Sequence, residues 1–160
     1  MPDMVNVTLN GAATALPAAA GDTLLEALRA AGLRSVKHGC ETGDCGACAV
    51  LVDGVARTTC VMLAEQARDR AITTLESLGC ADGLHPLQEA FVETGAIQCG
   101  YCTPAMVMAA CELLAQKPQP TEADVCDALS GTLCRCTGYV KPVAAVLQAA
   151  EKMRAQEVSK

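Results

Sequence analysis

The chain has 160 residues, about half of them apolar, and a formal net charge of −6 at pH 7. This length allows one domain or two small ones, and the apolar content is sufficient for a packed core without disulfide crosslinks. The acidic charge and the scarcity of aromatic residues (one Phe, two Tyr, no Trp) argue against a nucleic-acid partner, because phosphate binding needs a basic surface.

The N-terminus carries neither the basic region nor the apolar region of a signal peptide. The longest apolar stretch, Ala105–Cys111, is too short to span a bilayer. We therefore expect a cytoplasmic protein without a membrane span, in a compartment where thiols stay reduced. There, a cysteine-rich sequence indicates metal binding before disulfides.

The first half of the chain alternates short strand patterns with one helix. Apolar and polar residues alternate over 5–9, Asn10-Gly11 is a strong hairpin signal, and residues 12–16 can form the returning strand. Asp22 or Thr23 can cap a helix that ends at Gly32.

A loop over residues 37–47 with three glycines comes next. It leads into a second strand pair, over 49–52 and from 55 onward, with Asp53-Gly54 at the turn. Residues 61–68 are compatible with a short helix, and residues 71–74 with a last strand. This order predicts a β-grasp, plant-type ferredoxin-like domain over residues 1–76.

The second half carries helical signals only. Helices are expected over about 86–94, 103–116 and 140–154, with another opening at Thr121. Thr103 precedes a proline and is expected as an N-cap, whereas Thr121 and Asp124 approximate a capping box. The chain is thus predicted to be α+β, with an all-helical, four-helix bundle-like domain over residues 77–160.

Eight of the eleven cysteines form two groups of four, which is the number of thiolates that a [2Fe–2S] cluster requires. The first cysteine quartet has the spacing C-x4-C-x2-C-x11-C, of which the first two intervals match the plant-type pattern. The second has the spacing C-x2-C-x31-C-x1-C. The first quartet is Cys40, Cys45, Cys48 and Cys60, and the second is Cys99, Cys102, Cys134 and Cys136.

The surroundings of both quartets suit an anionic cluster. Gly39, Gly43 and Gly46 would let the first loop curl tightly and turn its N–H groups towards sulfur. Cys99 and Cys102 precede a predicted helix, whose N-terminus offers free N–H groups and partial positive charge.

Two alternatives to iron–sulfur clusters stay open from the residues alone. Zinc also binds four cysteines, although the spacings C-x4-C-x2-C and C-x1-C are unusual for it. Disulfides are disfavoured by the expected compartment. Cys80, Cys111 and Cys126 remain, and they are interpreted as structural residues, as buried free cysteines behave like small hydrophobic side chains. His38 is interpreted as a partly exposed loop residue rather than a ligand.

Three segments together resemble the xanthine oxidase family of molybdenum hydroxylases, and the resemblance covers essentially the whole chain. The segments are GCETGDCGAC from Gly39, QCGYCTP from Gln98 and LCRCTGY from Leu133. The resemblance implies a separate small iron–sulfur subunit with two [2Fe–2S] clusters and no substrate site of its own. It implies a large molybdenum–pterin subunit and a medium FAD subunit as partners, in a heterotrimer or a dimer of heterotrimers.

The resemblance also implies roles and a direction of electron transfer. Gln98 matches the residue that contacts the pterin, and Cys136 matches the cluster ligand nearest to it. Electrons would pass from molybdenum to the second cluster, then to the first, and then to FAD or another acceptor. Glu41, Ala49, Ala105 and Thr132 depart from the residues common in the family, but none of them replaces a ligand. A free-standing two-cluster ferredoxin is the alternative function.

Overall fold

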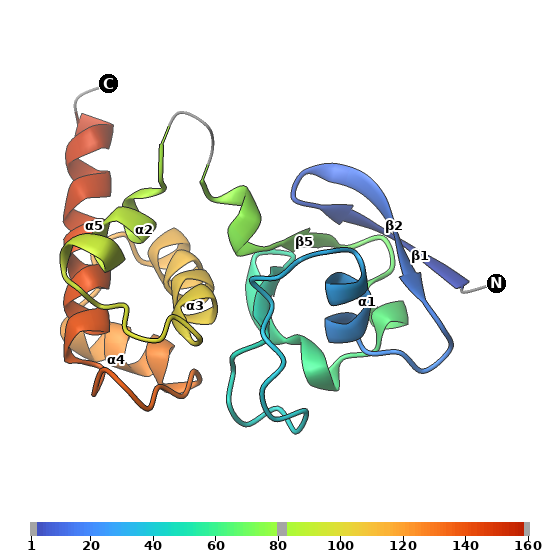
Figure 1. Ribbon diagram of the computed structural model, residues 1–160. Helices are drawn as coiled ribbons and strands as arrows, with labels where there is room; N and C mark the ends of the chain where they lie inside the picture. Colours follow the sequence, from blue (N-terminus) through green and yellow to red (C-terminus); the bar gives the residue numbers. More distant parts are fainter. Residues whose placement is uncertain (1–2, 80–82, 159–160) are drawn as a thin grey trace.

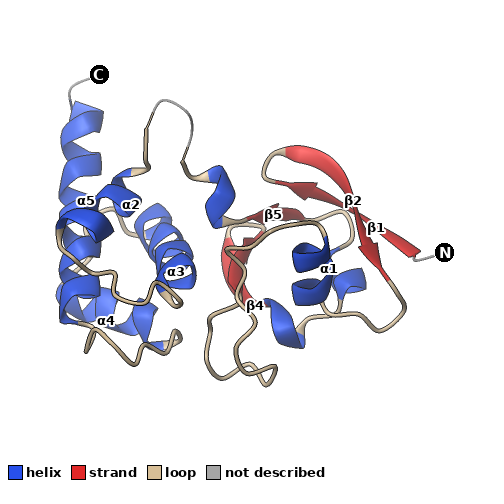
Figure 2. Cartoon of the chain, viewed as in Figure 1, coloured by secondary structure: helices blue, strands red, loops and turns tan. Residues whose placement is uncertain are grey.

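The computed structural model describes residues 3–79 and 83–158. Figure 1 shows a sheet-containing half and a helical half lying side by side. Figure 2 shows that the strands belong to the first half, which confirms the predicted α+β class. Cys80 lies outside the described residues.

The described strands of the first half form one mixed sheet in the order β2-β1-β5-β3-β4. Strands β1 and β5 pair in parallel, whereas the other neighbours are antiparallel. Asn10 and Gly11 have φ angles of 51° and 83°, as expected of the predicted hairpin turn. The strands are β1 Asp3–Leu9, β2 Ala12–Ala18, β3 Ala49–Val52, β4 Val55–Thr58 and β5 Ala71–Thr73.

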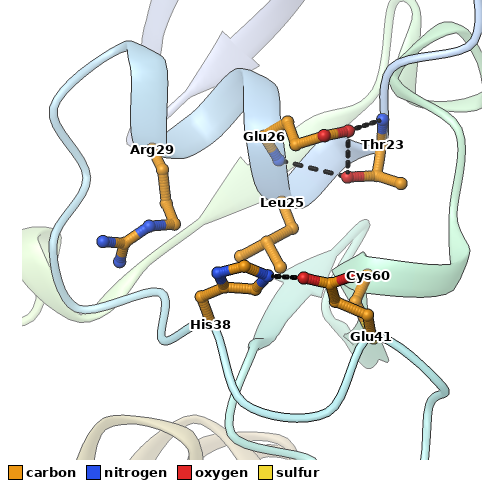
Figure 3. A pocket seen from close by; sticks show the side chains of 7 residues that line it. All are labelled: Thr23, Leu25, Glu26, Arg29, His38, Glu41 and Cys60. Carbon is orange, nitrogen blue, oxygen red and sulfur yellow. Dashed lines mark hydrogen bonds and ion pairs between the residues drawn. The ribbon is translucent and has the colours of Figure 1, made fainter.

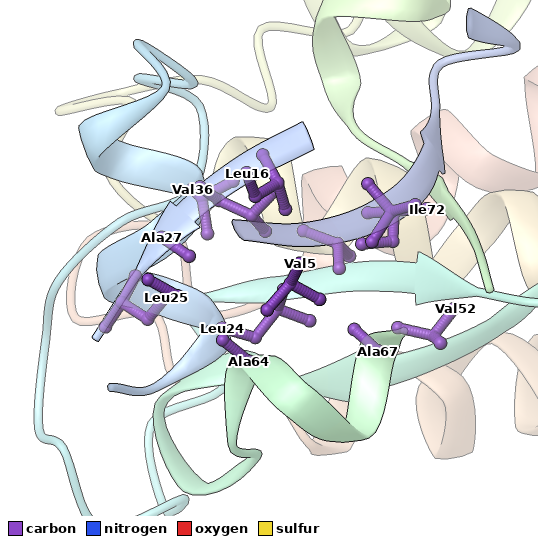
Figure 4. Packing of buried hydrophobic residues seen from close by; sticks show 14 of the residues in the cluster. Val5, Leu16, Leu24, Leu25, Ala27, Val36, Val52, Ala64, Ala67 and Ile72 are labelled. Carbon is purple, nitrogen blue, oxygen red and sulfur yellow. The ribbon is translucent and has the colours of Figure 1, made fainter. Parts of the chain in front are cut away.

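Helix α1 (Leu24–Ala30) covers one face of this sheet. It begins in a capping box, in which Thr23 accepts from the Glu26 N–H and Glu26 accepts from the Thr23 N–H. Its apolar side chains are buried with Val5, Leu16 and Ile72 in the core of this half (Figure 4).

The prediction of a single short helix over residues 61–68 is wrong. Two 3-10 turns are present instead, η1 (Thr59–Val61) and η2 (Ala64–Ala67). Between them the backbone is drawn into a bridge with the start of α1, because Leu24 N donates to Met62 O and Ala64 N donates to Asp22 O.

The second half contains α2 (Pro86–Glu93), α3 (Thr103–Gln116), α4 (Glu122–Ser130) and α5 (Val140–Val158). They pack around buried Leu87, Phe91, Met106 and Val146, as expected of a helical bundle. The Thr121–Asp124 capping box is confirmed. Thr103 is not an N-cap: Cys102 takes that position and makes no side-chain capping bond. No glycine or proline follows Arg154, and α5 continues beyond it.

The two halves meet where α3 packs against β3 and β4. Ala56 N, on the edge strand β4, donates to the Glu112 carboxylate of α3 over 2.9 Å. Leu75 and Leu78, in the connection, pack against the helical core. In the part of the chain that is described, no helix is long and apolar enough to cross a membrane.

Candidate metal centres

The fold brings the first cysteine quartet together at one end of the sheet-containing half. Cys40, Cys45 and Cys48 lie in the loop between α1 and β3, and Cys60 lies in η1. Cys48 and Cys60 are buried, whereas Cys40 and Cys45 are partly exposed. The turn at Asp53-Gly54 reverses the chain between β3 and β4, so that Cys60 returns to the loop.

Within this quartet the strongest thiol–thiol interactions join Cys40 with Cys45 and Cys48 with Cys60, and Cys40 also acts on Cys60. The Thr42 hydroxyl and the N–H groups of Cys45 and Thr42 hydrogen-bond to Cys40 Sγ and lower the pKa of Cys40 to about 6. Burial, followed by the neighbouring Cys48 thiol, raises the pKa of Cys60 to about 11. The Cys40 sulfur therefore already receives the backbone N–H groups that stabilise a bound thiolate.

Two positions in the loop of the first quartet have special backbone requirements, Gly39 and Glu41. A Cβ on Gly39 would lie 2.7 Å from Cys45 Sγ, so this glycine gives the sulfur room. Glu41 adopts φ 61°, in the left-handed region that favours glycine. The His38 side chain forms an ion pair with Glu41 at the surface of the loop.

A pocket of about 420 Å³ opens beside the first quartet, between α1 and the loop (Figure 3). Its charged groups already have partners within the fold. Glu26 caps α1, Arg29 donates to Val36 O, and His38 contacts Glu41. The lining residues are Thr23, Leu25, Glu26, Arg29, His38, Glu41 and Cys60.

The second quartet lies in two loops at one end of the helical bundle. Cys99 and Cys102 come from the loop between α2 and α3, and Cys134 and Cys136 come from the loop between α4 and α5. Cys102 is buried, Cys134 is partly exposed, and Cys99 and Cys136 are exposed. Residues 30 or more positions apart in the sequence are thus brought together, as the spacing predicted.

In this quartet the strongest thiol–thiol interactions join Cys102 with Cys134 and Cys99 with Cys136, and Cys99 also acts on Cys102. Burial, with the adjacent Cys134 thiol, raises the pKa of Cys102 to about 12. Burial opposes ionisation of Cys134 as well, but hydrogen bonds from Thr137 outweigh it and lower the pKa of Cys134 to about 7. The uncapped N-terminus of α3 adds N–H groups next to Cys102.

Sequence reasoning missed the residues that shape the loop between α4 and α5. The Tyr139 hydroxyl accepts from Cys134 N over 2.8 Å and donates to Thr132 O over 3.2 Å. Thr137 Oγ1 lies 3.1 Å from Cys134 Sγ and accepts from Tyr139 N. A signal was available, because two of the three aromatic residues of the chain stand in the second-quartet motifs.

Gln98 lies next to this quartet on the surface. Its side-chain amide donates to the Cys136 carbonyl oxygen over 3.1 Å. The amide is exposed, so its second N–H and its carbonyl oxygen are available to a molecule outside the chain.

The loops of the two quartets contact each other directly. Leu133 N donates to the carbonyl oxygen of Cys45 over 2.9 Å, and the Tyr101 hydroxyl donates to His38 O over 2.5 Å. Gly46, at φ 68°, approaches so closely that a Cβ there would overlap the carbonyl oxygen of Gly131. A single hydrogen bond therefore links Cys45 of the first quartet to Leu133, the chain neighbour of Cys134.

The arrangement of the thiols bears on which metal the donor set fits. Among the described residues, no group of three or more His, Cys, Asp or Glu side chains could hold a metal ion. A mononuclear zinc site needs four ligands around one ion. Two thiol pairs per site instead fit a cluster with two irons, each bound by two thiolates. The donor sets are therefore compatible with [2Fe–2S] clusters.

The remaining described cysteines differ from each other. Cys111 is partly buried and packs against the helical core, as expected of a structural thiol, and burial raises its pKa to about 11. The expectation of burial is wrong for Cys126, which faces solvent on α4.

Two family descriptions match this arrangement. The 2Fe-2S iron-sulfur cluster binding domain matches residues 7–81, and the [2Fe-2S] binding domain matches residues 74–147. The class is thus a protein with two [2Fe–2S] domains in series, which agrees with the order of the two quartets.

Full-length relatives make the assignment specific. The nicotinate dehydrogenase small FeS subunit of Eubacterium barkeri is 49% identical over 92% of this chain and 95% of its own length. The xanthine dehydrogenase iron-sulfur-binding subunit of Escherichia coli O157:H7 is 45% identical over 89% and 91%. The crystal structure of quinoline 2-oxidoreductase from Pseudomonas putida 86 contains a chain with a TM-score of 0.92 and 38% identity, covering 98% of both chains. The chain belongs to the xanthine oxidase family, among its small iron–sulfur subunits.

Proposed function

We propose that this chain conducts electrons within a molybdenum hydroxylase complex, with all eight quartet cysteines as cluster ligands. The thiol pairs suggest which cysteines share an iron. These are Cys40 with Cys45, Cys48 with Cys60, Cys99 with Cys136, and Cys102 with Cys134. A bound [2Fe–2S] cluster would supply reversible one-electron chemistry at each site.

The observation that carries this proposal is the hydrogen bond between Leu133 N and Cys45 O. It joins the backbone next to Cys134 directly to the backbone of a first-quartet cysteine. Tyr101 adds a second connection through His38 O. Two sites held in this way can exchange electrons inside one chain, which a pair of independent ferredoxin domains could not ensure.

The second quartet is the proposed entry site. Ile97, Tyr101, Leu133 and Val140 are exposed apolar side chains in or beside its loops, and Val140 is 77% exposed. A large molybdenum–pterin subunit would cover this rim and exclude water from Cys99 and Cys136. Gln98 would keep its bond to Cys136 O and present its carbonyl oxygen to the pterin.

The first quartet is the proposed exit site, with a medium FAD subunit as acceptor. A heterotrimer or a dimer of heterotrimers in the cytoplasm is the proposed assembly, and the two domains are proposed to divide at residues 76 and 77. The chain itself contributes no substrate site in this proposal.

Purification of the native protein under anaerobic conditions tests the assembly. We expect the chain to co-elute with a larger subunit that contains molybdenum, and to resist separation in moderate salt. A chain that elutes alone with both clusters intact would instead favour a free-standing ferredoxin.

A further inference from the structure

A basic groove, distinct from the pocket of Figure 3, lies beside the segment that holds Cys60. It has a volume of about 320 Å³ and is lined by Arg57, Thr58, Val61, Met62, Gln66 and Arg70. Thr58 and Val61 are chain neighbours of the segment that holds Cys60, so the groove borders the first site through the backbone of η1.

Val61 connects this groove to the loop of the first quartet. Its side chain is 57% exposed, and its Cγ1 would lie 3.3 Å from a Cβ on Gly43. Figure 1 shows the turns after β4 beside this loop. Val61 therefore lies beside Gly43 of the cluster loop and also faces solvent, where a docked partner would contact it.

Neither arginine of the groove is held by a strong interaction within the fold. The Arg57 side chain makes no hydrogen bond or ion pair with any residue that the structure describes. Arg70 reaches Asp53 only at 3.5 Å, at the surface, where such a pair contributes little. Both arginines are exposed, on a chain whose formal net charge is −6.

The charged groups of the pocket in Figure 3 differ from those of the groove. In that pocket Glu26, Arg29 and His38 already have partners within the chain. The pocket therefore does not present a partner with unpaired charges of a single sign. The groove offers the unpaired cation of Arg57 and the loosely paired cation of Arg70 around an apolar centre, which is the composition of an electrostatically steered docking surface.

We infer that the basic groove formed by Arg57, Val61 and Arg70 is where the electron acceptor of the first cluster docks, and that this acceptor is a protein presenting carboxylates. This inference rests on the proposed function, and adds to it the surface and the charge of the partner. In the step concerned, one electron leaves the reduced first cluster and one acceptor centre is reduced.

Two haem proteins of opposite charge can serve as probes, acidic cytochrome b5 and basic cytochrome c. The full chain with both clusters is reduced with dithionite, freed of excess reductant and mixed with each probe in a stopped-flow instrument. Arg57→Glu and Arg70→Glu are compared with the control Arg34→Glu, at an exposed arginine that does not line the groove. Each variant changes the formal charge by the same amount.

Steering by the groove predicts that Arg57→Glu and Arg70→Glu slow cytochrome b5 reduction about ten-fold at low salt, with the difference lost at high salt. Arg34→Glu should change the rate less than two-fold. Equal effects of all three variants would overturn the inference, because net charge alone would then explain them. An effect seen with ferricyanide but not with cytochrome b5 would also overturn it, in favour of a small-anion site.

Failure of this inference can be separated from failure of the proposed function. EPR spectra of each variant report whether both clusters are present before mixing. Intact spectra with unchanged rates reject the docking surface alone, whereas missing clusters in the unsubstituted chain reject the ligand assignment.

Discussion

Cys99, Cys136 and Cys126 are all exposed to solvent, but only Cys99 and Cys136 belong to a proposed cluster site. Exposure by itself would make all three reactive towards alkylating agents. A thiolate bound to iron is withdrawn from that reaction, so reactivity can separate ligands from free thiols at single-residue resolution.

In the cluster-loaded protein at pH 8, we expect iodoacetamide to modify Cys126 rapidly and to leave Cys99 and Cys136 unmodified. Cys111 should also resist, because a pKa of about 11 leaves only about one thiol in a thousand ionised at pH 8. Its reactivity should rise as pH approaches 11. Peptide mass spectrometry before and after cluster removal gives the measurement, and labelling of Cys99 in the loaded protein would contradict its role as a ligand.

At the level of single residues, sequence analysis could group the cysteines because the short spacings within each motif are a local property of the chain. It could not find Tyr101 or Gly46 as contact residues, because their partners His38 and Gly131 lie 63 and 85 positions away. Cys126 was misjudged for a related reason: helix periodicity alone does not say which side of α4 meets the bundle.

At the level of elements, strand alternation and capping residues predicted most of the helices and strands correctly. The segment after β4 was the exception. Its hydrogen bonds go to residues 22 and 24, so a long-range bridge overrides the local preference for a continuous helix. The contact of α3 with β3 and β4 likewise includes a hydrogen bond between Ala56 N and Glu112, which no local pattern encodes.

The contact between the two cluster loops yields a prediction about Gly46. Gly46→Ala places a Cβ in a left-handed backbone conformation and against the Gly131 carbonyl, so the loops must move apart. We expect weaker magnetic coupling between the two reduced clusters in EPR spectra and a lower melting temperature.

Gly54→Ala is the matched control, because Gly54 has φ 81° with nothing within 4 Å of an added Cβ. It should cost only the backbone strain of about 1 kcal/mol and leave the coupling unchanged. Unchanged coupling in Gly46→Ala would show that the Cys45–Leu133 contact does not set the cluster separation.

At the level of the whole molecule, the chain combines two small cores with one site at an end of each. The first core is closed by α1 over the sheet, and the second by helices around Phe91. Packing of α3 on β3 and β4 fixes the two cores relative to each other, which keeps Leu133 within reach of Cys45. The architecture thus serves to hold two redox sites at a constant separation.

Metal analysis combined with EPR spectroscopy of the native protein tests this account most directly. We predict about four iron and four acid-labile sulfide per chain, with two distinct [2Fe–2S] signals after reduction. Cys136→Ser should alter or abolish one signal, Cys60→Ser the other, and each variant should retain its unaffected signal. Stoichiometric zinc without iron, or two full signals in Cys136→Ser, would contradict the assignment of the two quartets.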